Sequence, residues 1–189
     1  MGHGRRIRTA LAVLVLGAGI GLSAGCVPSE AVDECAPRQA YAPASRPTRL
    51  AINHDAFDAK HVGHTADGRQ FFLTTPFDVG TQEAGSRFFV ALYLFDGSGR
   101  FLRADINAFT EKPDESAALE ATYDRRLQEL GAVTFDRIVV EPFSVERFGL
   151  TFGLIVKPPE SVDDIWWITV EPGDYMAFSA PWDCGVYDT

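Results

Sequence analysis

Three histidines and two aspartates lie within eleven residues and form the densest group of candidate metal ligands in the sequence. They are His54, Asp55, Asp58, His61 and His64. In a helix, His54, Asp58 and His61 would share one face at positions i, i+4 and i+7, and imidazole and carboxylate groups in such an arrangement bind zinc. His61 and His64 alone would share a face of a turn. The segment is therefore a candidate zinc site. A metal-dependent hydrolase that uses this site is one of the functions to test.

The same segment also suits a polar loop between the first two strands, with imidazoles that bond to backbone groups or face water. No His-Glu-x-x-His motif and no Cys-x-x-Cys pair accompanies it. We therefore expect no resident cofactor, with zinc as the alternative.

Nucleophilic catalysis has little support in the sequence. Ser98 stands in Asp96-Gly97-Ser98-Gly99, which is typical of a hairpin turn and lacks the strand-to-helix context of a nucleophile elbow. Asp163 and Asp164 are adjacent, so on a strand they would point to opposite faces, and we interpret them as solvated loop acids. Catalytic residues remain unidentified, which favours a binding or accessory role.

The N-terminus has the order of an export signal. Arg5, Arg6 and Arg8 precede an uncharged, largely apolar run from Thr9 to Leu22. Ser23-Ala24-Gly25-Cys26 then resembles the lipobox of bacterial lipoproteins, with Leu22 one place further out than the usual leucine. The resemblance implies that Cys26 receives a diacylglyceryl thioether and anchors the exported chain to a membrane.

The resemblance also suggests a destination. The residue after the lipidated cysteine is Val27. It is not the aspartate that can retain lipoproteins at the inner membrane. The expected place is therefore the outer membrane of a Gram-negative cell, or the outer face of the cell membrane where there is only one.

Two alternatives to lipidation stay open. Ser23 and Gly25 also satisfy the small-x-small rule of ordinary signal cleavage, which would release the protein without a lipid. The uncharged span from Thr9 to Ser29 has 21 residues, just enough for an uncleaved membrane helix. Its glycines and short apolar core favour a signal.

The other two cysteines suggest a disulfide. Cys35 and Cys184 form an even pair in an exported, oxidising setting. Closing a loop of this length stabilises a fold by roughly 5 kcal/mol in the chain-entropy description. Two unrelated free thiols are the alternative.

Charge excludes one class of partner. The first 25 residues hold three arginines and no acidic residue, so the chain from Cys26 on has 14 basic and 26 acidic residues and a net charge of −12. Such a chain repels nucleic acid, and we expect no nucleic-acid partner.

The sequence divides into three segments. Residues 1–25 are the predicted signal, 26–49 a lipidated cysteine and a proline-rich tether, and 50–189 a single globular domain.

Strand patterns dominate the globular domain. In residues 88–95 both the odd-numbered and the even-numbered positions are apolar, which predicts a central strand covered on both faces. A helix is predicted over 114–130, since Pro113 suits its first turn and Gly131 the position after its end. The fold class is therefore α+β, a mainly antiparallel sheet with one principal helix packed on a face. In full, the predicted strands are 69–77, 87–95 (the central one), 101–108, 132–140, 148–156, 165–170 and 175–178.

Some stretches of the domain resemble a known group of proteins. These are His64-Thr65-Ala66-Asp67-Gly68-Arg69-Gln70-Phe71-Phe72, Leu92-Tyr93-Leu94-Phe95-Asp96, Pro181-Trp182-Asp183 and Tyr187-Asp188-Thr189. They are similar to little-characterised bacterial proteins, some of which are named formate hydrogenlyase regulatory protein HycA. The resemblance implies a shared domain over most of residues 50–189 and transfers no site residues. A cytoplasmic regulatory role does not suit an exported, acidic chain.

Three functions follow as hypotheses. The leading one is a membrane-tethered extracytoplasmic binding or accessory module of the cell envelope, with an envelope protein or a small ligand as partner. The others are a metal-dependent hydrolase that uses the segment from His54 to His64, and an immunity-like inhibitor that covers a partner's active site with its acidic face.

Overall fold

The computed structural model describes residues 45–80 and 85–189. The predicted signal, Cys26 and Cys35 lie outside these residues. The described part is built mainly of antiparallel strands with one helix, in agreement with the predicted mainly antiparallel α+β class. In chain order its elements are β1 (Leu50–Ile52), β2 (His61–Thr65), β3 (Gln70–Thr74), β4 (Phe77–Asp78), β5 (Arg87–Phe95), β6 (Phe101–Thr110), α1 (Pro113–Glu129), β7 (Val133–Phe135), β8 (Ile138–Val140), β9 (Phe143–Arg147), β10 (Leu150–Lys157), β11 (Trp167–Glu171) and β12 (Ala177–Phe178).

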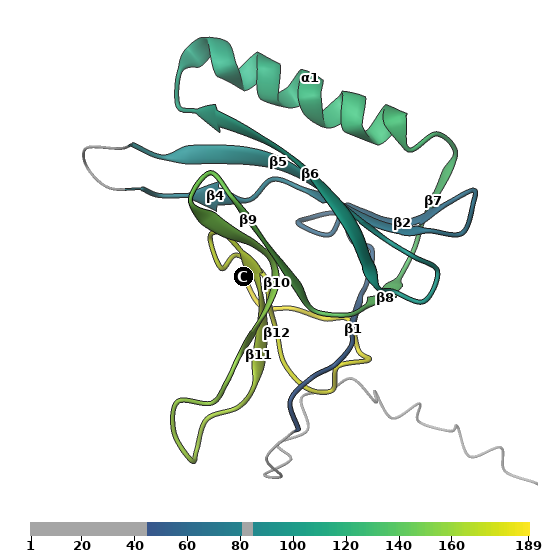
Figure 1. Cartoon of the computed structure of the whole chain (residues 1–189), viewed down its shortest axis with the longest axis vertical. Coiled ribbons are helices and arrows are strands. Elements are labelled where there is room, and N and C mark those ends of the chain that lie inside the picture. The colour runs from purple at the N-terminus through teal and green to yellow at the C-terminus, as the bar shows by residue number, and fades with distance from the viewer. Residues whose placement is uncertain (1–44, 81–84) are drawn as a thin grey trace, which may run out of the picture. The chain divides into compact units, whose positions relative to one another are not determined.

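The strands form two main sheets and one short pair. The larger sheet has the order β4-β5-β3-β2-β7, and β6 pairs with β5. The smaller sheet has the order β12-β11-β10-β9, and β1 pairs with β8. Figure 1 shows α1 lying across one face of the larger sheet, with the smaller sheet on the other side.

Strand β5 lies inside the larger sheet and is covered on both faces, as its sequence predicts. Phe89, Tyr93 and Phe95 belong to a core that includes Phe152 and Ile168 of the smaller sheet. Residues 90, 92 and 94, on the opposite face of β5, belong to a second core. This alternation explains why, after Arg87, both faces of β5 carry apolar or aromatic side chains.

Helix α1 covers the second face of β5. Its side chains Leu119, Tyr123 and Leu127, and that of Leu130 just after it, pack against buried residues of β3 and β5. The helix begins at Pro113, which needs no hydrogen-bond partner for its nitrogen, and is followed by Gly131 with φ of 72°. The predicted bounds therefore differ by one residue at each end.

The hairpin between β5 and β6 has the predicted turn. The Asp96 carboxylate accepts hydrogen bonds from Ser98 Oγ (2.6 Å), Ser98 N (2.9 Å) and Arg100 N (3.0 Å). These bonds hold the pKa of Asp96 well below its usual value, and the bond from the Ser98 side chain has the largest effect. The Ser98 hydroxyl thus serves the turn.

Of the predicted strands only 87–95 has the observed bounds; 101–108, 165–170 and 175–178 differ by one or two residues at one or both ends from β6, β11 and β12, and three others differ more. The stretch 69–77 divides into β3 and β4, and 132–140 divides into β7 and β8. The strand predicted to begin at Phe148 begins at Leu150, because Phe148 and Gly149, with φ of 54° and 74°, form the turn after the unpredicted strand β9. Gly149 is a common turn residue, but Phe148 is not, and its apolar side chain continues the alternation of the following strand, so the sequence pattern favoured one continuous strand.

Candidate functional site

The structure does not bring the predicted metal ligands together. His54 and Asp58 lie in the non-helical connection between β1 and β2, whereas His61 and His64 belong to β2. Residues three apart on a strand point to opposite faces, so His61 and His64 diverge. Among residues 45–80 and 85–189, no group of three histidine, cysteine, aspartate or glutamate side chains is arranged to hold a metal ion. The helical face considered for His54, Asp58 and His61 is therefore not formed.

The histidines make packing and polar contacts instead. His61 Nδ1 lies 2.6 Å from the hydroxyl of Tyr123, which donates to the carbonyl of Leu73 at 3.3 Å. Burial, followed by the charges of Lys60 and His54, lowers the pKa of His61. This chain of contacts joins β2, β3 and α1.

The other two histidines contact β7 and its turn. The ring of His54 stacks on Phe135 with centroids 5.7 Å apart, and His64 Nδ1 lies 2.7 Å from Asp136 Oδ1. Both contacts lie at the surface, where His54 is exposed and the His64 side chain is 37% exposed. We interpret all three imidazoles as parts of the sheet edge.

Cys184 lies in the C-terminal tail beside the end of β1. Its amide donates to the carbonyl of Pro181 (3.0 Å), and its own carbonyl accepts from Asn53 Nδ2 (2.7 Å). The predicted bridge to Cys35 stays a prediction, because Cys35 lies outside the described residues.

Thiol titration of the mature protein tests that bridge. We expect no free thiol from Cys35 or Cys184 in denatured, unreduced protein, and two after reduction, because exported cysteine pairs oxidise. Two free thiols before reduction would rule the disulfide out.

The C-terminal tail forms one side of a surface hollow. The amide of Ala51 donates to the carbonyl of Trp182 (2.8 Å), and the amide of Asn53 donates to that of Gly185 (3.1 Å). These bonds place the tail against β1 and the connection that follows. We call the resulting cavity of about 490 Å³ the tail hollow; its lining residues are Asn53, Asp55, Phe57, Asp58, Gly185, Val186, Tyr187 and Thr189.

Gly185 permits this close approach. A Cβ at this position would lie 2.6 Å from Asn53 Oδ1, and its φ of 70° disfavours other residues. Glycine at this position therefore lets the tail lie close to Asn53 without steric conflict.

Asp55 holds the two sides of the tail hollow together. One of its carboxylate oxygens accepts the amides of Phe57 (2.7 Å) and Ala59 (3.2 Å), and the other accepts the hydroxyl of Tyr187 (2.5 Å). Burial and the bond to Asp55 raise the pKa of Tyr187 to about 12, so this hydroxyl remains a donor at neutral pH. The arrangement fixes the backbone that carries Phe57.

Phe57 and Asp58 line the tail hollow with side chains that contribute little to the packing or hydrogen bonding of the described residues. Phe57 is 81% exposed, although apolar side chains of this size are usually packed, and Val186 opposite it is 61% exposed. The Asp58 carboxylate has no hydrogen bond or ion pair with the described part of the chain. Burial and the nearby Asp55 raise its pKa.

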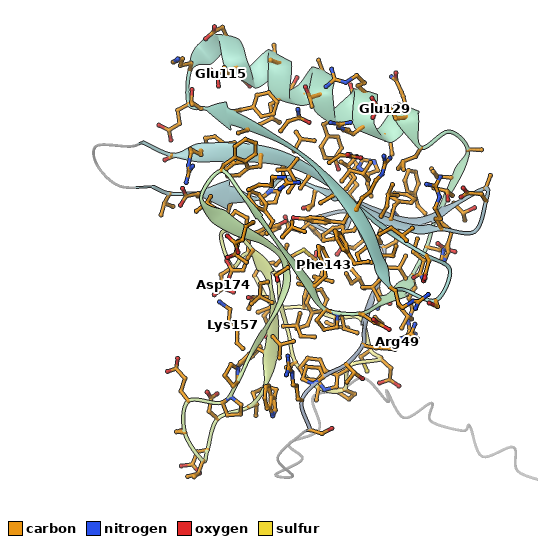
Figure 2. All side chains as sticks on the ribbon, viewed as in Figure 1. Arg49, Glu115, Glu129, Phe143, Lys157 and Asp174 are labelled. Carbon is orange, nitrogen blue, oxygen red and sulfur yellow. The ribbon has the colours of Figure 1, made fainter. Side chains whose placement is uncertain are left out.

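Acidic residues continue beyond the tail hollow. A neighbouring hollow shares Val186 and Tyr187 with it, and a third hollow shares Ala177 and Asp188 with that neighbour. The third has a volume of about 470 Å³, and its acidic lining residues are Glu160, Asp164, Asp174 and Asp188. Its single basic lining residue, Lys157, is paired with Glu171 at 2.7 Å. Lys157 and Asp174 are labelled together beside the smaller sheet in Figure 2.

Sequence reasoning missed the tail hollow as a site. It singled out Asp58 only as a metal ligand, and Tyr187 only as part of a stretch that resembles a known group of proteins. An apolar residue between acids, as in Asp55-Ala56-Phe57-Asp58, is the single local signal, and it does not predict that residues 185–189 lie opposite.

Comparison with protein families, curated proteins and solved structures gives no match for this chain. The described residues include no helix with the length and apolar content that a membrane crossing requires.

Proposed function

We propose that this chain is a lipid-anchored binding module of the bacterial cell envelope, with the tail hollow as its binding surface. Its N-terminal segment resembles a lipoprotein signal ending at Cys26, and a proline-rich tether separates that residue from β1. The proposal has two parts, an anchor and a binding surface. Each has its own test.

One observation carries the binding part. The tail hollow presents an exposed aromatic ring beside a carboxylate that has no partner among the described residues, on a backbone fixed by Asp55 and Tyr187. An isolated exposed apolar residue needs no explanation, but one held rigidly at the rim of a cavity is typical of a binding site.

An inhibitor of the immunity type is the second candidate. The acidic side chains that line the tail hollow and the third hollow favour it, because such a surface can cover a basic active site. This role uses the same surface and the same anchor, so it differs from the first only in what the partner does.

Photocrosslinking in living cells tests the binding surface. A photoreactive p-benzoylphenylalanine in place of Phe57 keeps an aromatic ring at the rim, and we expect it to give a crosslinked product of discrete mass. The matched control carries the same group in place of Val162, which is 99% exposed and does not line the tail hollow. Identical product patterns from both positions, or no product from position 57, would refute the proposal.

A further inference from the structure

We propose that the tail hollow binds the side chain of a lysine or arginine in a basic peptide segment of the partner. This inference rests on the proposed function, which makes the tail hollow the binding surface, and adds the chemistry of the ligand. Four features of the described residues support it: the free carboxylate, the apolar rim, the lining charges and the acidic side chains beyond the tail hollow.

The two carboxylates of the tail hollow differ in the hydrogen bonds that they accept. Asp55 already accepts three hydrogen bonds, two from backbone amides and one from Tyr187. Asp58 accepts none from the described residues and is exposed at the rim of the tail hollow. An exposed carboxylate without a protein donor can accept a charge-assisted hydrogen bond from a cation of the ligand.

The apolar side chains suit the stem of such a cation. Lysine and arginine carry three or four methylene groups below the charged group, and these pack on apolar surface while the charge reaches a polar partner. Phe57 and Val186 offer that surface beside Asp58. The phenyl ring of Phe57 also attracts a cation that lies over its face.

The charges around the tail hollow favour a cation over an anion. Its lining, drawn from the described residues, contains two aspartates and no lysine, arginine or histidine. The chain from Cys26 on has a net charge of −12. A basic ligand is therefore attracted over a distance, and an acidic one is repelled.

The acidic side chains beyond the tail hollow favour a peptide over a small free amine. A chain that leaves the tail hollow along the C-terminal tail meets Asp188 and then the other acids of the third hollow. A free amine would fill one hollow and leave these carboxylates unused. A segment with several basic residues uses them together.

Peptide binding to the full mature protein in an uncharged detergent tests the inference. The probe is a short fluorescent peptide of alternating leucine and lysine, and its counterpart has glutamine at each lysine. We expect the lysine peptide to bind at least about tenfold more tightly, and less tightly as salt is added. We expect Phe57→Ala and Asp58→Asn each to weaken its binding by about tenfold.

Two control variants separate the site from general charge and exposure. Asp124→Asn removes an exposed acid on α1, and Val162→Ala removes an exposed apolar side chain away from the tail hollow. Both should bind the lysine peptide as the unchanged protein does. Weakening by Asp124→Asn equal to that by Asp58→Asn would overturn the inference.

The remaining outcomes distinguish this inference from the proposed function. Equal binding of the lysine and glutamine peptides, both weakened by Phe57→Ala, would overturn the cationic ligand and leave the binding surface in place. Failure of the lysine peptide to bind would also overturn the inference, while photocrosslinking at position 57 tests the surface separately. If butylammonium competes as strongly as the unlabelled peptide, the inferred peptide ligand would be overturned in favour of a small free amine.

Discussion

We expect Cys26→Ser to abolish the palmitate incorporation and membrane attachment that the proposed lipid anchor requires. Serine has no thiol from which a diacylglyceryl thioether can form, so the first step of lipoprotein processing is lost. Each buried methylene group contributes about 0.8 kcal/mol to membrane binding, so the proposed anchor, with two or more acyl chains, is expected to hold the unchanged protein almost irreversibly. Labelled palmitate and membrane fractionation of expressing bacteria measure both effects.

Processing of the Cys26→Ser precursor gives a second readout. If the lipid-dependent peptidase is the only route, the precursor stays uncleaved. Cys35→Ser is the matched control, because it removes a thiol nine residues further on and should leave labelling unchanged. A label-free, released wild-type protein, together with a Cys26→Ser variant cut at the same bond, would mean ordinary secretion.

Gly153→Ala will destabilise the domain by about 4 kcal/mol, since backbone strain and overpacking each contribute roughly 1–3 kcal/mol. Gly153 has φ of 131°, and a Cβ there would lie 2.3 Å from the carbonyl oxygen of Phe143 on the adjacent strand β9. Strand β9 cannot move away freely, because the ring of Phe143 stacks on Phe101 with centroids 4.3 Å apart and contacts Tyr93 at 5.0 Å. Gly153 is therefore needed for the β9–β10 pairing.

Urea denaturation measures this loss as a lower midpoint with an unchanged slope. Gly131→Ala is the matched control: Gly131 also has positive φ, at 72°, but no atom lies within 4 Å of its added Cβ. It should lose only the backbone strain, about 1 kcal/mol. Equal losses in the two variants would show that the contact with Phe143 contributes nothing.

Features encoded by neighbouring residues could be predicted from the sequence. The two apolar sets of β5, the acids of Asp114 and Glu115 at the start of α1, and the turn at Asp96–Gly99 each depend on a few consecutive side chains. Such patterns determine the element type because strands and helices have fixed periods and turns need particular residues. The lipoprotein signal is likewise a local pattern, and it remains a prediction of the sequence.

The tail hollow, in contrast, was decided by tertiary structure. Asp55 and Tyr187 are 132 positions apart, and they meet because backbone hydrogen bonds place residues 182–185 against β1. The role of His61 was decided in the same way, since its partner Tyr123 arrives only when α1 packs on the larger sheet. Sequence patterns describe which face of an element is apolar, but which distant segment covers that face depends on the packing of the whole domain.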